Sequence, residues 1–325
     1  MLMKKRIGLI TSGGDAPGMN ACVRAVVRTA AQNDVEIIGF IRGYEGVLDK
    51  DFVVMKNENV AQIIQRGGTI LKTARCKRFY EAEHRAKAAE NLRELGVDSL
   101  IAIGGDGTFT GAVLLQKEHG FKVVGVPGTI DNDLFGTDFT IGYDTAINTV
   151  VEAVDKIRDT AFSHDRIFVV EVMGRDAGFI ALRSGIAVGA EAILVPETKT
   201  DIDRVLKRLE GRRKSKQSAI IIVAEGDEFG GAEDVAKAVM KKYVDREVKV
   251  TKLGHIQRGG NPSAMDRVLA GFLGVGAVEA VLEEVSGVMI GMQHKKIVRI
   301  PLEKAIKHHQ DVDDNLLRIT EMLSV

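Results

Sequence analysis

The sequence predicts an α/β protein with mostly parallel sheets. Short runs of apolar, often β-branched residues alternate along the chain with segments that repeat apolar residues at helical spacing. This alternation is typical of β-α-β units, whose strands run parallel. Glycine makes up 35 of the 325 residues, about 11% against an average near 7%. At roughly 150 residues per domain, this length predicts two domains.

The expected strands are runs that are short and β-branched enough to be buried strands rather than buried helices. In chain order they are 7–10, 35–41, 100–103, 123–126, 167–172, 192–195 and 219–224. Glycines follow many of these runs, at Gly13–Gly14, Gly104–Gly105, Gly128, Gly174 and Gly226. In parallel sheets ligands bind beyond the carboxyl ends of the strands, so these glycines mark candidate binding loops.

The segments between the runs show helical spacing. One helix carries an apolar stripe made of Ile147, Val150, Val151, Val154 and Ile157. A second is expected to begin near Thr200, followed by Asp201 and Asp203, and to continue through Leu206 and Leu209. A third is marked by Val235, Val239 and Tyr243.

Composition excludes several classes of protein. With 45% hydrophobic and 28% charged residues, the chain is not disordered. Lys plus Arg and Asp plus Glu both number 45, so we expect no nucleic-acid partner. Cys22 and Cys76 do not form a disulfide framework. The first apolar run ends at Ile10, too short for a signal peptide or a membrane span. A soluble cytoplasmic protein without a membrane partner is expected.

The first chemical motif, residues 11–20, follows the first strand. Gly13 and Gly14 would let backbone N–H groups approach a phosphate at the start of the next helix. The alternative is a tight strand-to-helix turn in which Asp15 caps the helix. The segment matches neither the Walker A pattern nor the dinucleotide fingerprint.

Two further motifs place aspartates after strands. In residues 103–108, Asp106 lies among glycines, which suits Mg²⁺, and Thr108 either caps a helix or touches a phosphate. In residues 127–133, Asp131 and Asp133 can divide proton acceptance from metal binding or orientation. The alternatives are an aspartate turn and an Asx-rich turn.

The last two motifs carry cations. In residues 171–178, Arg175 can neutralise a transferring phosphoryl group, although a lone arginine is usually a surface ion-pair partner. In residues 253–262, His255 and Arg258 beside a glycine pair suit a phosphomonoester dianion. The alternative for His255 is a hydrogen-bonded core histidine.

The five motifs together, in this order and spacing over nearly the whole chain, resemble the bacterial-type ATP-dependent 6-phosphofructokinase family. The resemblance implies two Rossmann-like three-layer αβα domains with mostly parallel sheets, the phosphofructokinase fold. It implies an ATP-binding domain (1–140 and 257–306) and a sugar-phosphate-binding domain (141–256 and 307–325). The implied enzyme phosphorylates D-fructose 6-phosphate at the 1-hydroxyl to give fructose 1,6-bisphosphate and ADP. This is the committed step of glycolysis, and the implied enzyme is an allosterically regulated homotetramer.

The resemblance also implies roles for individual residues. Asp131 accepts the proton of the 1-hydroxyl, Thr129 and Arg175 stabilise the γ-phosphoryl group, and Asp133 supports them. The implied ATP-binding residues are Gly14, Arg75, Cys76, Gly105, Asp106, Gly107 and Thr108, with Asp106 holding Mg²⁺. The implied sugar-phosphate residues are Thr129, Ile130, Asp131, Arg166, Met173, Gly174, Arg175, Glu225, Lys249, His255 and Arg258. Arg166 reaches the 6-phosphate from a neighbouring subunit.

An effector site for ADP or phosphoenolpyruvate is implied as well. Its residues are Arg24, Arg28, Arg158, Gly189, Glu191, Lys214 and Lys216, whose alternative is ordinary solvated charge. The chain departs from the family in carrying Lys249 where the family has arginine. Lysine loses the bidentate fork, which predicts weaker sugar-phosphate binding. Asn57 and Gln217 also stand at basic effector positions.

Three other functions compete. Pyrophosphate-dependent phosphofructokinases typically carry Asp and Lys where this chain has Gly107 and Gly128, and these glycines leave room for the rest of ATP. Lipid and NAD kinases share the GGDGT loop but lack the other motifs. A catalytically silent nucleotide sensor has no need of Asp106, Asp131 and Arg175 together.

Overall fold

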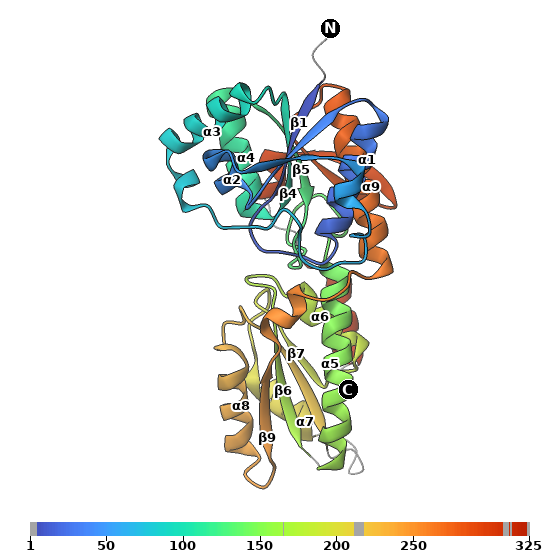
Figure 1. Cartoon of the computed structure of the whole chain (residues 1–325). Coiled ribbons are helices and arrows are strands. Elements are labelled where there is room, and N and C mark those ends of the chain that lie inside the picture. Colours follow the sequence, from blue (N-terminus) through green and yellow to red (C-terminus); the bar gives the residue numbers. More distant parts are fainter. Residues whose placement is uncertain (1–4, 165, 211–217, 308–311, 313, 324–325) are drawn as a thin grey trace. The chain divides into compact units, whose positions relative to one another are not determined.

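The computed structural model describes residues 5–164, 166–210, 218–307, 312 and 314–323 (Figure 1). The chain forms two compact units. Unit 1 comprises Met1–Ile130, Leu134–Asp144 and Arg258–Gln310, and unit 2 comprises Asp131–Asp133, Thr145–Gln257 and Asp311–Val325. Apart from the short segment Asp131–Asp133, the units change over after residues 144, 257 and 310. The sequence predicted domain boundaries after 140, 256 and 306. The ligand of each domain stays a prediction.

Unit 1 contains a seven-stranded sheet in the order β11-β10-β5-β4-β1-β2-β3. Its strands are β1 (Arg6–Thr11), β2 (Glu36–Phe40), β3 (Phe52–Met55), β4 (Ser99–Gly104), β5 (Lys122–Pro127), β10 (Val288–Gln293) and β11 (Lys296–Pro301). The five central strands are parallel, whereas β3 and β11 run antiparallel to their neighbours at the two edges. The carboxyl ends of β1, β4 and β5 therefore meet at one edge of the sheet.

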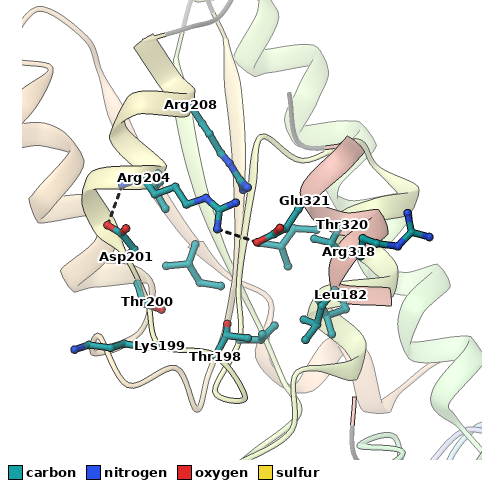
Figure 2. A pocket seen from close by; sticks show the side chains of 15 residues that line it. Leu182, Thr198, Lys199, Thr200, Asp201, Arg204, Arg208, Arg318, Thr320 and Glu321 are labelled. Atoms are coloured by element: carbon teal, nitrogen blue, oxygen red, sulfur yellow. Dashed lines mark hydrogen bonds and ion pairs between the residues drawn. The ribbon is translucent and has the colours of Figure 1, made fainter. Parts of the chain in front are cut away.

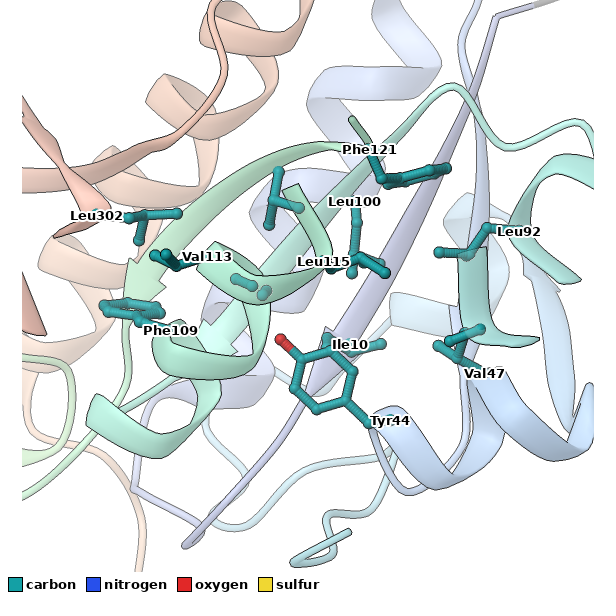
Figure 3. Close-up of a cluster of buried hydrophobic side chains, with 14 of the residues drawn as sticks. Ile10, Tyr44, Val47, Leu92, Leu100, Phe109, Val113, Leu115, Phe121 and Leu302 are labelled. Carbon is teal, nitrogen blue, oxygen red and sulfur yellow. The ribbon is translucent and has the colours of Figure 1, made fainter. Parts of the chain in front are cut away.

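Helices cover both faces of this sheet (Figure 1). They are α1 (Met19–Gln32), α2 (Tyr44–Asp49), α3 (Ala82–Glu94), α4 (Asp106–His119), α9 (Ala264–Leu282) and α10 (Leu302–Lys307), with 3₁₀ turns at Asn57–Val60 and Lys77–Tyr80. On one face α1 and α9 pack closely, because a Cβ on Gly274 would lie 2.7 Å from the Cβ of Ala25. On the other face Ile10, Leu100 and Phe109 belong to an apolar core beneath α3 and α4 (Figure 3).

Unit 2 contains a parallel four-stranded sheet in the order β7-β8-β6-β9. Its strands are β6 (Ile167–Val172), β7 (Ala192–Leu194), β8 (Ala219–Ala224) and β9 (Val248–Lys252). Its helices are α5 (Tyr143–Ser163), α6 (Phe179–Ala187), α7 (Ile202–Glu210), α8 (Gly231–Lys242), α11 (Asp314–Leu323) and the 3₁₀ turn Gly254–Arg258. Val205 of α7 and Val235 of α8 pack on one face. Gly185 of α6 packs against Ile193, which points to the other face.

The predicted fold class is confirmed, since both units are parallel α/β structures and every predicted strand is present. Strands β3, β9, β10 and β11 were not predicted from the sequence. The second predicted helix is present and begins at Ile202, near Thr200 as predicted. Asp201 caps it, because Oδ1 of Asp201 accepts the backbone N–H of Arg204 at 3.0 Å. Tyr243 directly follows α8 rather than lying within it.

Candidate active site

In unit 1 the loop after β1 is fixed against the end of β4. The N–H of Ser12 donates to the carbonyl of Ile103 at 3.0 Å. The hydroxyl of Thr108, on the first turn of α4, donates to the carbonyl of Ser12 at 3.0 Å. Thr108 therefore does not cap α4 but holds Gly13–Gly14 beside the start of that helix. Two glycine turns and one helix N-terminus thus lie together, an arrangement suited to a polyphosphate.

Arg258 lies directly over the first glycine turn. A Cβ on Gly14 would overlap Nη1 of Arg258, and Nη1 donates to the carbonyl of Asp15 at 3.3 Å. The expected alternative role of Asp15 as a helix cap is wrong, since Gly18 is the N-cap of α1 and no side chain caps it. A side chain at position 14 would therefore have to displace this guanidinium.

Two side chains that the sequence analysis did not single out hold the segment 66–76 against the same turn. The amide Nδ2 of Asn20 donates to the carbonyls of residues 66 and 67 at 3.1 Å each, and Oδ1 of Asn20 accepts the N–H of Ile70 at 2.7 Å. The hydroxyl of Thr73 donates to the carbonyl of Gly13 at 2.7 Å. These bonds place the end of the segment beside the glycine turn.

The segment ends in two predicted ATP ligands, Arg75 and Cys76. Burial raises the pKa of the Cys76 thiol to about 11, and a hydrogen bond with Glu45 acts in the same direction. Cys76 is therefore a neutral thiol near pH 7. Such a side chain can contribute a packing surface for a ligand but not a nucleophile.

Asp106 is half-buried and lies in the first turn of α4. The glycine on one side of it is packed against another side chain, whereas the glycine on the other side faces open space. A Cβ on Gly105 would lie 3.4 Å from the Cβ of Thr129, whereas a Cβ on Gly107 would meet no atom within 4 Å. Among the described residues no group of three or more His, Cys, Asp or Glu side chains could hold a metal ion. A single carboxylate beside open space suits Mg²⁺ that keeps its waters and is held jointly by substrate phosphates.

In unit 2 the carboxyl end of β6 brings three predicted residues together. Nε of Arg175 lies 3.6 Å from Oδ2 of Asp131, whose side chain is only 3% exposed. The backbone N–H of Arg175 donates to Oε1 of Glu225 at 2.8 Å. Arg175 has a φ of +53°, and a Cβ on Gly226 would overlap its carbonyl oxygen. The pair thus joins a guanidinium whose side chain is 47% exposed to a buried carboxylate, and the catalytic role of Arg175 stays a prediction.

The motif around Asp131 is divided between the two units. Thr129 and Ile130 are buried in unit 1, where the carbonyl of Thr129 accepts the hydroxyl of Thr140 at 2.6 Å. Asp131 and Asp133 belong to unit 2. The same holds for the last motif, since His255 belongs to unit 2 and Arg258 to unit 1. His255 is exposed, so its alternative role as a core histidine is wrong.

The end of β6 is also tied to the 3₁₀ turn that carries His255. The N–H of Met173 donates to Oε1 of the fully buried Gln257 at 3.2 Å. Nε2 of Gln257 donates to the carbonyl of Gly254 at 3.0 Å. Gln257 was not identified from the sequence as a site residue, but it links Met173 and Gly174 to the predicted phosphate-binding turn.

Two predicted phosphate ligands share one carboxylate at the β9 edge of the sheet. Nζ of Lys249 lies 2.6 Å from Oε1 of Glu247, and Nε of Arg166 pairs with Oε2 of the same residue. The hydrogen bond from Lys249 and then that from Arg166 lower the pKa of Glu247. Glu247 thus pairs with both Arg166 and Lys249, and their role in phosphate binding stays a prediction. No pattern in the sequence pointed to Glu247.

The predicted effector residues fall in both units. Arg24 and Arg28 lie one turn apart on α1, and partial burial followed by the charge of Arg28 lowers the pKa of Arg24. In unit 2 the guanidinium of Arg158 donates to the carbonyl of Val188. Glu191 is buried and accepts the N–H of Ile220 at 2.7 Å.

At those remaining predicted effector positions that the structure describes, no side-chain contact indicates a ligand. Gly189 has a φ of +59°, and Asn57 begins a 3₁₀ turn. Lys214, Lys216 and Gln217 lie outside the described residues.

Fold and site together define a parallel α/β protein whose strand ends carry phosphate-type glycine turns and an aspartate–arginine pair. The phosphofructokinase family profile matches residues 6–281. The chain is 52% identical to "ATP-dependent 6-phosphofructokinase 2" of Bacteroides thetaiotaomicron over 322 residues, which are 99% of each chain. It is 54% identical to "ATP-dependent 6-phosphofructokinase 1" of Thermus thermophilus over 322 residues, which are 99% of this chain and 100% of that protein. The chain therefore belongs to the phosphofructokinase family.

Solved structures agree with this assignment. Phosphofructokinase from Saccharomyces cerevisiae superposes with a TM-score of 0.89 at 42% identity, covering 94% of this chain and 45% of that chain. This chain thus spans less than half the length of the yeast protein. A pyrophosphate-dependent phosphofructokinase from Marinobacter aquaeolei has a TM-score of 0.84 at 22% identity over 96% of this chain and 86% of its own, and shares the fold. No helix in the described part of the chain is long and apolar enough to cross a membrane.

Proposed function

We propose that this chain is an ATP-dependent 6-phosphofructokinase of glycolysis. It transfers the γ-phosphoryl group of ATP to the 1-hydroxyl of D-fructose 6-phosphate. The observation that carries the proposal is the buried carboxylate of Asp131 within 3.6 Å of Arg175, in a chain about half identical over its full length to relatives named for this reaction.

Asp131 is the proton acceptor in this reaction. Phosphoryl transfer passes through a loose transition state, so the acceptor must be well placed rather than strongly basic. The hydrogen bond between Glu225 and the N–H of Arg175 holds the arginine beside Asp131. There its guanidinium can neutralise charge on the transferring group. Thr129 and Asp133 support the same step.

Unit 1 binds ATP. The N–H groups of the Gly13–Gly14 turn and of the first turn of α4 face the phosphates, and the open space beside Gly107 takes part of the nucleotide. Arg75 and Cys76 complete the nucleotide site. Asp106 would hold Mg²⁺, which would supply positive charge to the phosphates of ATP.

Unit 2 binds the sugar phosphate. Met173, Gly174 and Glu225 hold the sugar, and His255 binds its 6-phosphate. The role in phosphate binding that the resemblance implies for Arg258 stays a prediction, because Arg258 belongs to unit 1. Arg166 and Lys249 reach the 6-phosphate of a neighbouring subunit, which requires an oligomer, and by resemblance to the family this oligomer is a homotetramer. ADP or phosphoenolpyruvate regulates the enzyme at the predicted effector residues.

A coupled assay with purified protein tests the proposal. Fructose 6-phosphate and Mg²⁺ are supplied with ATP or with pyrophosphate. Turnover with ATP alone is expected, because Gly107 leaves its side of the site open. Turnover with pyrophosphate alone would overturn the donor assignment, and no turnover with either donor would indicate a silent nucleotide sensor. Adding ADP or phosphoenolpyruvate is expected to change the sugar-phosphate saturation curve.

A further inference from the structure

Unit 2 contains a cavity that none of the predicted site residues lines. It has a volume of about 370 Å³ and lies at β7, the edge strand of the sheet, between α7 and α11 (Figure 2). This volume falls within the range of small-molecule sites, roughly 300–1,000 Å³.

Two arginines of α7 point into this cavity from one side. Arg204 and Arg208 are one helical turn apart, and Nη1 of Arg204 pairs with Oε1 of Glu321 on α11 at 2.8 Å (Figure 2). Within the described parts of the chain no carboxylate pairs with Arg208. Burial and then the charge of Arg204 lower the pKa of Arg208. The two guanidinium groups therefore repel each other, while the charge of Glu321 acts in the opposite direction on Arg208. The cations that line the cavity (Lys199, Arg204, Arg208 and Arg318) outnumber its carboxylates (Asp201 and Glu321).

Part of the cavity lining is apolar. It is formed by Leu182 of α6, Ile193 of β7 and Val195 directly after β7. A site that combines two guanidinium groups with an aliphatic wall suits a ligand that has an anionic end and a carbon body. Free inorganic anions would leave the apolar wall in contact with water.

We propose that this cavity binds a small organic phosphate, with its phosphate on Arg204 and Arg208 and its carbon body on the apolar wall. A phosphomonoester carries a charge of about −1.5 to −2 near pH 7, which matches two guanidinium groups better than the single carboxylate of Glu321 does. Arginine binds phosphate oxygens through two parallel N–H donors. The ligand would displace Glu321 from Arg204.

Hydrogen exchange on the full-length protein tests the proposal, because it reports where a ligand binds. Phenyl phosphate, which offers a phosphate and an apolar ring, is expected to slow exchange in α7 and α11. Arg208→Gln is expected to raise the phenyl phosphate concentration needed for half of this slowing by on the order of tenfold. This is the usual change in affinity when one charged hydrogen-bond partner is lost. Lys207→Gln is the matched control, since it removes the same charge from the same helix at an exposed position outside the cavity.

Three outcomes would overturn the proposal. They are no slowing in α7 and α11, equal loss in Arg208→Gln and Lys207→Gln, and equal slowing by inorganic phosphate and phenyl phosphate. The first two outcomes would show that the arginine pair does not bind the phosphate. The third would show that the apolar wall does not contribute to binding. If Arg208→Gln does not fold, as judged by its melting temperature, Arg204→Gln takes its place with the same expectations.

Discussion

Nε of Arg175 lies 3.6 Å from Oδ2 of Asp131, and the backbone N–H of the same arginine donates to Oε1 of Glu225 at 2.8 Å. One residue thus connects a buried carboxylate from the third motif with the loop after β8. The backbone of Arg175 is left-handed, with a φ of +53°, a conformation that non-glycine residues adopt only where the surroundings impose it.

Replacing the proton acceptor should abolish turnover without preventing binding. In Asp131→Asn the shape is kept but the proton acceptor is lost, so kcat is expected to fall about 10²–10⁴-fold. The KM for fructose 6-phosphate should change only a few-fold, because the amide fills the same space. Steady-state kinetics of both parameters check this. A near-normal kcat in the Asp131→Asn variant would remove Asp131 from its proposed role.

The turn that carries Arg175 leaves no room for a side chain at position 226. A Cβ there would overlap the carbonyl oxygen of Arg175, so Gly226→Ala must displace the turn. We expect kcat to fall at least tenfold and the melting temperature to drop. Gly271→Ala in α9 is the matched control, since its Cβ would meet nothing within 4 Å and alanine favours a helix. Equal kinetics in the two variants would contradict the role of this turn.

The sequence revealed the parts of the fold that bury continuous apolar strands. β4 and β8 are buried at every residue and were predicted, whereas β9, which has no fully buried residue, was not. A half-exposed strand such as Val248–Lys252 mixes valine with lysine and shows no continuous apolar run.

The residues of the candidate site also divide into those that could be predicted from the sequence and those that could not. Glycines and charges directly after strands could be predicted, because parallel strands bring their carboxyl ends to one edge. Asn20 and Gln257 could not, because each bonds backbone groups far away in sequence, at Ile70 and Met173. Such bonds leave no periodic pattern. Nor could the sequence show that Glu191 is buried against Ile220.

Restoring arginine at position 249 should strengthen sugar-phosphate binding. The side chain of Lys249 is 48% exposed and its Nζ contacts Glu247, so a longer guanidinium can be accommodated there. Arginine offers a bidentate fork to phosphate that lysine lacks. In Lys249→Arg we expect the KM for fructose 6-phosphate to fall several-fold with kcat unchanged. Lys252→Arg on the same strand is the control, and an identical change in both variants would rule out a specific contact.

The choice of phosphoryl donor should depend on the open space beside Gly107. Because a Cβ at this position meets no atom within 4 Å, Gly107→Asp should fold with an unchanged melting temperature. Its carboxylate would occupy the space proposed for ATP and repel the phosphates, so the KM for ATP is expected to rise at least tenfold. The KM for fructose 6-phosphate should stay within a few-fold. Gly107→Ala separates bulk from charge, and a Gly107→Asp variant that binds ATP as well as the parent would place the nucleotide elsewhere.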